Sequence, residues 1–215
     1  MIVVRIDEAT LGADGSTLFA DLAFLAERGQ PPVVVAPTSG AARAIVRTMN
    51  RTGDIAVGVS GADAGTIPAA GESVGSIQTR LLHTLLGAGY VPVIEPLALG
   101  FLGSDVAVAA DEVASALACA LSAKRALFFN DAGGVIDAQT QTIIDELTPA
   151  EALALADESA FPQALKAAIR AAALGVRGGV GAAQILDGRI QHATIVEMLT
   201  ARHLGTRVIG TVFVA

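Results

Sequence analysis

Val33-Val34-Val35, directly after Pro31-Pro32, is the stretch that decides the fold. Three consecutive branched apolar residues with no polar residue between them are typical of a strand buried on both faces of a parallel sheet. On either side, the spacing of apolar residues predicts helices over Ser16–Arg28 and about Ala41–Arg51. A short buried strand between two helices is the repeating unit of an α/β protein.

The same alternation continues along the whole chain. It predicts further strands at Ile2–Ile6, Ile55–Val59, Tyr90–Ile94, Ala126–Phe129 and Ala182–Leu186. It predicts further helices at Gln78–Leu86, Ala110–Ala123, Pro149–Ala156, Pro162–Leu174 and Ala193–Arg202, and a terminal hairpin over Thr206–Val214. We therefore expect an open three-layer αβα sandwich with a mainly parallel sheet, in one domain spanning 1–215 or in two lobes that share one sheet.

Composition excludes several classes of protein. Hydrophobic residues make up 53% of the 215 residues and charged residues 16%, which excludes global disorder. The net charge of −7, without a basic cluster, disfavours nucleic acid and anionic membranes as partners. The best candidate for a membrane span, Val106–Ala123, is interrupted by Asp111 and Glu112. The single Cys119 cannot form an internal disulfide, and the N-terminus lacks the pattern of a signal peptide, so we expect a cytoplasmic protein.

Two loops after predicted strands have the residues for binding a nucleotide. Gly58–Gly65 is rich in small residues whose N–H groups can approach a phosphate, although an ordinary tight turn has the same composition. Asn130-Asp131-Ala132-Gly133-Gly134-Val135 follows a buried strand at a position where nucleotides often bind, and it also reads as a turn.

Few other residues point to chemistry. Asp111 opens a predicted helix, where a carboxylate commonly complements the helix dipole; as a functional residue it would orient a lysine or hold a metal-bound phosphate. The three histidines, His83, His192 and His203, are not spaced as metal ligands, so no metal site of the protein's own is expected.

Taken together and in this order, these loops resemble the amino-acid kinase family, specifically its acetylglutamate kinase branch. Ala56–Gly65 is similar to the branch's A-V-G-L-S-G-x-D-G-G, and Gly89–Pro96 to its G-x-x-P-V-I-x-P. Ala110-Asp111 with Ala114 is similar to the end of N-x-N-A-D-x-x-A, and Phe129–Val135 to L-T-D-V-x-G-V. The closing pattern is matched by Val176–Val180, Asp187-Gly188-Arg189, His192, Glu197 and Gly205-Thr206.

The resemblance implies a carbamate kinase-like fold and transfer of the γ-phosphate of ATP to the side-chain carboxylate of N-acetyl-L-glutamate, a step of arginine biosynthesis. It implies ATP with Mg²⁺ as cofactor, a small acidic amino-acid derivative as substrate, and a homodimer or higher homo-oligomer. An N-terminal lobe (about 1–103) would bind the acid and a C-terminal lobe (about 104–215) the nucleotide. The implied catalytic residues are Asp111, Arg5 and Lys166; the implied nucleotide-binding residues are Gly58, Ser60, Gly61, Asn130, Asp131, Gly133, Gly134 and Val135.

The chain departs from the family where the phosphate and the acid would bind. The opening K-x-G-G is replaced by Arg5-Ile6-Asp7-Glu8, which keeps a cation but puts two carboxylates where a phosphate needs bare backbone. The substrate loop H-G-G-G is replaced by Ala36–Gly40, and alanines 107 and 109 stand where the family has two asparagines. Lys166 lies near the place of the second catalytic lysine, but out of register.

These departures lead us to expect a kinase-like protein with weak or absent catalysis. Two alternatives stay open. One is an active kinase on another amino acid or on carrier-linked aminoadipate, which would use Arg5 and Lys166 in place of the lysines. The other is a regulatory or structural partner of an active paralogue.

Overall fold

The computed structural model describes residues 1–12, 16–51, 53–157, 161–200 and 203–210. Its centre is one eight-stranded sheet with the strand order β10-β12-β11-β9-β1-β2-β6-β3. In that order the strands span Glu146–Leu147, Thr206–Ile209, Ala182–Leu186, Arg125–Phe129, Ile2–Arg5, Val33–Val35, Val91–Ile94 and Ala56–Val59. All neighbours from β11 to β3 pair in parallel, whereas β12 runs antiparallel to β11. The expected mainly parallel sheet is therefore confirmed.

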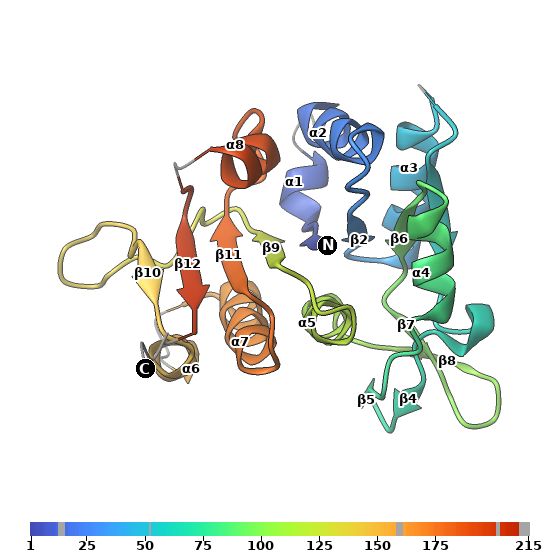
Figure 1. The fold of residues 1–215 in the computed structure, drawn as a ribbon. Coiled ribbons are helices and arrows are strands. Elements are labelled where there is room, and N and C mark those ends of the chain that lie inside the picture. Colours follow the sequence, from blue (N-terminus) through green and yellow to red (C-terminus); the bar gives the residue numbers. More distant parts are fainter. Residues whose placement is uncertain (13–15, 52, 158–160, 201–202, 211–215) are drawn as a thin grey trace, which may run out of the picture.

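Helices cover both faces of the sheet (Figure 1). One face is covered by α4, α5, α6 and α7, which span Arg80–Gly87, Ala110–Ala120, Pro149–Asp157 and Gln163–Arg177. The other is covered by α1, α2, α3 and α8, which span Glu8–Gly12, Ser16–Glu27, Ser39–Met49 and Ala193–Leu199. The three-layer αβα sandwich is confirmed.

Successive strand residues supply the two cores in turn. Val33 and Val35 pack into the core under α5 and α7, while Val34 between them packs into the core under α2 and α3. Each of these valines is fully buried, and burying such a side chain contributes about 1.5–3 kcal/mol. This strand therefore lacks polar residues because both of its faces are buried, as the sequence predicts.

Several short elements were not expected from the sequence: two hairpins, the edge strand β10, the helix α1 and a 3-10 helix at Asp63–Gly65. The hairpins pair β4 (Ala69–Ala70) with β5 (Ser73–Val74), and β7 (Leu97–Leu99) with β8 (Asp105–Ala107). Strands of two or three residues are too short to show a period of two. The helix α1 begins directly after β1, where the resemblance places a glycine loop.

Other boundaries differ by a few residues at helix ends. The helix expected over Ala193–Arg202 ends at Leu199, and that expected over Pro162–Leu174 spans Gln163–Arg177. The second arm of the expected terminal hairpin lies outside the described residues. One sheet runs through both expected lobes, whose boundary at 103/104 stays a prediction. No helix in the described ranges is long and apolar enough to cross a membrane.

Candidate functional site

The carboxyl ends of β1, β9 and β11 meet at one edge of the sheet, because these strands are parallel neighbours. Arg5 is the last residue of β1, and its guanidinium lies between two groups. Nη2 donates to Asp111 Oδ2 at 3.0 Å, and Nη1 lies 3.4 Å from the carbonyl oxygen of Phe129. The structure thus brings together two of the three predicted catalytic residues, which are 106 positions apart in the sequence.

Asp111 is part of an ion pair rather than a helix cap. The cap of α5 is Ala109, while Asp111 lies in the first turn and is buried with its side chain toward Arg5. Burial raises the pKa of Asp111 above its ordinary value, and the attraction and hydrogen bond of Arg5 oppose that rise. Among the described residues, its second oxygen, Oδ1, is buried and has no hydrogen-bond partner.

The segment after Arg5 forms a helix start instead of an open phosphate loop. Asp7 Oδ1 accepts a hydrogen bond from the backbone N–H of Thr10 at 2.9 Å, which caps α1 with a negative charge. Thr10 is buried against the loop after β11, where a Cβ at Gly188 would lie 2.5 Å from the Thr10 side chain. The N-terminus of α1 therefore already has a carboxylate at the place where an anion would bind.

The segment Ala36–Gly40, which the resemblance aligns with the substrate loop, contains a helix cap. Thr38 Oγ1 accepts a hydrogen bond from Ala41 N–H at 3.1 Å, and this bond caps the N-terminus of α3. The segment that replaces the family's glycine-rich loop thus has a local structural role.

The loop 130–135 after β9 is held by its neighbours. The buried Asn130 accepts a hydrogen bond from Ala132 N–H at 2.8 Å, and its carbonyl accepts one from Gly133 N–H at 3.1 Å. Val135 N–H donates to Thr206 Oγ1 at 2.7 Å. The N–H of Asn130 donates to the carbonyl oxygen of Leu186 at 2.9 Å, so four amides of this loop are used within the protein and few are left for a phosphate.

The loop after β11 closes over the same region. Arg189 donates to both carboxylate oxygens of Asp187 at 2.8 Å and to the carbonyl oxygen of Asp131 at 2.7 Å. Burial alone would raise the pKa of Asp187, but the hydrogen bonds and charge of Arg189 outweigh it and hold the pKa below its ordinary value. This bonding fixes the backbone of Asp131 against the neighbouring loop.

A cavity of about 610 Å³ lies directly beside the loop 130–135. Its lining is largely apolar, with amide and carboxylate groups at one side, as in many pockets for small molecules. The lining residues are Ala132, Ile136, Asp137, Ala138, Gln139, Gln141, Ile144, Leu155, Phe161, Pro162 and Leu165.

Lys166 follows the lining residue Leu165 in the first turns of α7 and is half-buried. It does not belong to the lining of this cavity, nor to that of the 480 Å³ cavity that borders Asp111 between α5 and α7. Its predicted catalytic role therefore stays a prediction.

The predicted phosphate contacts Gly58, Ser60 and Gly61 lie at the end of β3, the edge strand on the other side of the sheet. Four strand spacings separate β3 from β9, or about 19 Å. Asp63 accepts hydrogen bonds from both the N–H (2.7 Å) and the hydroxyl (3.1 Å) of Ser60. The structure thus does not bring these residues together with the loop 130–135.

Gly61 is required by packing. A Cβ there would overlap the carbonyl oxygen of Leu97 and lie 2.7 Å from that of Ile67. Close backbone approach therefore accounts for this glycine without a ligand.

Sequence reasoning placed Thr206 and Arg189 only in a closing pattern and not in the site. Both contact the loop 130–135, and Thr206 is fully buried although it is polar. The resemblance of Gly205-Thr206 to the family pattern was the one feature of the sequence that could have indicated a role for Thr206 in the site. In the described part of the chain, no group of three or more His, Cys, Asp or Glu side chains is placed to hold a metal ion.

Comparisons with known proteins agree with this architecture. Residues 38–185 match the model of the amino acid kinase family. The acetylglutamate kinase of Gluconobacter oxydans (strain 621H) is 31% identical over 210 residues, which cover 87% of this chain and 71% of that protein. The acetylglutamate kinase of Acidiphilium cryptum (strain JF-5) is 34% identical over 179 residues, or 74% of this chain and 60% of that protein. The chain thus spans about three fifths of the length of the latter relative.

Solved structures confirm the fold. N-acetylglutamate synthase from Neisseria gonorrhoeae, complexed with coenzyme A and N-acetyl-glutamate, superposes with a TM-score of 0.83 at 20% identity, covering 100% of this chain and 60% of that one. Carbamate kinase from Giardia lamblia bound to AMP-PNP superposes with a TM-score of 0.67 at 13% identity, covering 98% of both chains. The sequence match, the sheet order and the Arg5–Asp111 pair at the ends of β1 and α5 lead to one conclusion: the chain belongs to the amino acid kinase family, in its acetylglutamate kinase branch.

Proposed function

We propose that this acetylglutamate kinase-like protein binds a nucleotide beside the loop 130–135 and has weak or no phosphoryl-transfer activity of its own. The observation that carries the proposal is the arrangement after β1. Arg5 is engaged by Asp111, and Asp7 caps α1 with a carboxylate. Phosphoryl transfer depends on positive charge around the transferred group, and here the nearest cation is already neutralised.

The base and ribose of a nucleotide fit the 610 Å³ cavity. Asp131, Gly133, Gly134 and Val135 would lie at its edge, because this loop borders the cavity through Ala132. The N–H groups of Gly133 and Val135 bond within the protein, so they would order the loop rather than contact the ligand. ATP would supply the phosphoryl group of the family reaction.

The phosphate end fits less well. Mg²⁺ takes carboxylate oxygens and would accompany the nucleotide phosphates. The carboxylates at this end, Asp7 and Asp111, are engaged in a helix cap and an ion pair. The residues present therefore do not fit a metal-bound triphosphate in the arrangement seen, and we derive no transfer step through it.

Magnitudes support weak catalysis. Removing one preorganised charge-stabilising group typically lowers the rate by about 10²–10³-fold. Losing two or three such groups lowers it by roughly 10⁴–10⁶-fold, although the effects do not add. The altered opening and substrate loops together would bring turnover of N-acetyl-L-glutamate below useful levels.

The alternative is an active kinase on another amino acid or on carrier-linked aminoadipate. The observation in its favour is that Arg5 and Asp111 keep a cation and its organiser together, and that Asp111 borders a cavity of about 480 Å³. This alternative requires Lys166, so Lys166→Ala should abolish ATP-dependent phosphorylation. A panel of amino acids and N-acyl amino acids that gives no turnover with the unaltered chain would refute it.

A regulatory role or a homo-oligomer would use an exposed surface. Phe101 and Leu102, at the tip of the β7–β8 hairpin, are 102% and 90% exposed. An exposed apolar pair of this kind is typical of a contact surface. Serine at both positions should reduce concentration-dependent association in light scattering, and no association of the parent chain would argue against an oligomer.

Isothermal titration with adenosine, ADP and a non-hydrolysable MgATP analogue tests the main proposal. We expect a Kd tighter than about 1 mM, roughly −4 kcal/mol, with no gain as phosphates are added. Ala132→Trp, which fills the cavity, should abolish binding, whereas Ala70→Trp on the distant β4 hairpin should not. If no ligand binds, the proposal of a nucleotide site is refuted. If binding tightens strongly with each added phosphate, the proposal that the phosphate end of the site is blocked is refuted.

A further inference from the structure

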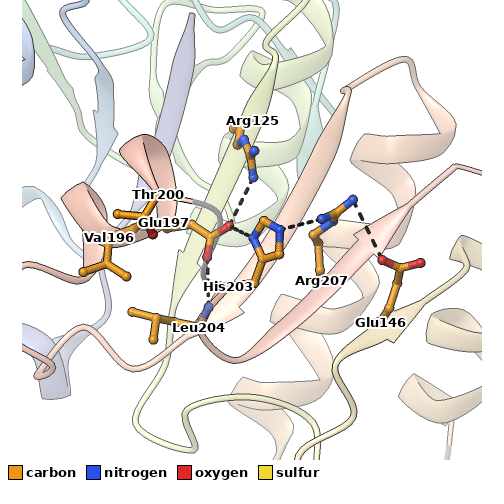
Figure 2. Close-up of polar contacts among 8 residues, drawn as sticks. All are labelled: Arg125, Glu146, Val196, Glu197, Thr200, His203, Leu204 and Arg207. Atoms are coloured by element: carbon orange, nitrogen blue, oxygen red, sulfur yellow. Dashed lines mark hydrogen bonds and ion pairs between the residues drawn. The ribbon is translucent and has the colours of Figure 1, made fainter.

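A chain of polar contacts links α8, β9, β12 and β10 (Figure 2). Its centre is Glu197, which has no exposed surface. Glu197 accepts hydrogen bonds from Arg125 Nη1 at 3.1 Å, His203 Nδ1 at 2.9 Å and Leu204 N–H at 3.0 Å. It therefore joins α8, β9 and the segment that enters β12.

The hydrogen bonds assign the protonation state of His203. Arg207 Nη1 lies 2.8 Å from His203 Nε2, and a guanidinium only donates. Nε2 must therefore accept, so the proton is on Nδ1 and the ring is neutral. A second proton on the ring would point an N–H at the Arg207 guanidinium and break this bond.

Charges around His203 come from four elements. Arg125 on β9 pairs with Glu197 on α8, and Arg207 on β12 lies 3.8 Å from Glu146 on β10. His203 links the two pairs, because one ring nitrogen contacts Glu197 and the other contacts Arg207.

The residues at the start of β12 pack against the loop 130–135. Gly205 has a φ of +69°, and a Cβ there would overlap the carbonyl oxygen of Ile185 and lie 2.7 Å from that of Gly133. The next residue, Thr206, accepts the hydrogen bond of Val135 N–H. The distance along the chain from His203 to this contact is only three residues, so the position of His203 fixes where Thr206 lies.

We infer that Glu197, His203 and Arg207 position the loop 130–135 through Gly205 and Thr206, and that this loop binds its nucleotide only while these hydrogen bonds hold it in place. His203 is a positioning residue, because it acts through Thr206. Its role in binding rests on the proposed nucleotide function, whereas its role in ordering the loop does not.

Two substitutions at His203 test whether its hydrogen bonds are what positions the loop. His203→Gln keeps a donor and an acceptor on one side chain, whereas His203→Leu removes both. We expect His203→Leu to weaken binding of ADP by about tenfold, which is about 1.4 kcal/mol, and His203→Gln to restore most of it. His83→Leu, the same change at an exposed histidine on α4, is the matched control.

Rescue by His203→Gln is the readout that a merely structural role would not give, because glutamine keeps a donor for Glu197 and an acceptor for Arg207. Equal ADP affinity of His203→Gln and a folded His203→Leu would overturn the inference, as would unchanged affinity of a folded His203→Leu.

Amide exchange distinguishes failure of this inference from failure of the proposed function. Val135 N–H is protected by its bond to Thr206, so its exchange should be about tenfold faster in His203→Leu, or in His203→Ala if His203→Leu does not fold, than in His203→Gln or His83→Leu. If the parent chain binds no ADP, faster exchange still supports the positioning role, and unchanged exchange refutes it.

Discussion

Replacing Arg5 by methionine removes the cation that faces Asp111 and leaves that carboxylate buried. The two side chains are 12% and 10% exposed, and their closest atoms are 3.0 Å apart. Removing one partner of a buried ion pair costs about 3–5 kcal/mol, because the other charge is left uncompensated. We expect Arg5→Met to lower the free energy of unfolding at neutral pH by about 3 kcal/mol. At roughly 2–4 °C per kcal/mol for a chain of this size, Tm should fall by about 6–12 °C.

The loss should depend on pH in a defined direction. Burial already raises the pKa of Asp111, and the charge of Arg5 opposes the rise, so removing Arg5 raises the pKa further. A carboxyl whose folded-state pKa is raised binds its proton more tightly in the folded than in the unfolded chain. Its contribution to stability is full at low pH and is lost as pH rises through the folded-state pKa. The deficit of Arg5→Met should therefore be smaller at about pH 5 than at about pH 8.

Urea denaturation of a double-mutant cycle measures the interaction directly. Asp111→Asn removes the carboxylate charge that Arg5→Met leaves unpaired. The stability loss of the double mutant should therefore be smaller than the sum of the two single losses by about 1–3 kcal/mol. Arg170→Met is the matched control, because its pair with Asp157 is as short (2.7 Å) but 53% and 72% exposed. That control should cost under about 1 kcal/mol. Additive losses in the cycle, or an equal loss in the control, would refute the reasoning.

Three further predictions rest on single residues. Gly205→Ala should cost over about 2 kcal/mol in thermal unfolding, because φ is positive and the Cβ meets backbone, whereas Gly65→Ala, with positive φ but open space, should cost about 1 kcal/mol. Asp7→Asn should strengthen binding of an MgATP analogue several-fold in calorimetry without changing adenosine affinity, and equal changes for both ligands would contradict the blocked phosphate end. Burial raises the pKa of the Cys119 thiol, so its reaction with a disulfide reagent at about pH 8 should be slower than that of the urea-unfolded chain, and equal rates would contradict the buried setting.

Local pattern was enough for most of the fold. The run Val33–Val35 and the helices beside it are local features, and their burial follows from composition alone. The β7–β8 hairpin was missed because its three-residue strands carry no periodic signal. The helix α1 was missed because the resemblance placed an open glycine loop there, whereas Asp7 supplies a helix cap.

The candidate site was harder to predict because its contacts are long-range. Arg5 and Asp111 were named from the family pattern, but the sequence does not show that they neutralise one another across 106 positions. Thr206 and Val135, 71 positions apart, were both part of matched motifs without any sign that they touch. Local propensity gives no information on such pairs, which only the order of strands in the sheet brings together.

Retained glycine motifs are weak evidence of retained chemistry in this chain. A Cβ at Gly61 would overlap the backbone of the β7 hairpin, and one at Gly205 would overlap β11, so both glycines are needed for packing whether or not a phosphate binds. Such glycines would be kept in an active and in an inactive member alike, so they do not distinguish the two. The segment after Arg5 differs, because the resemblance assigns the family's glycines there to the phosphate, whereas Asp7 here caps α1. The change of that segment to Asp7-Glu8 is therefore the observation on which the proposal of weak catalysis rests.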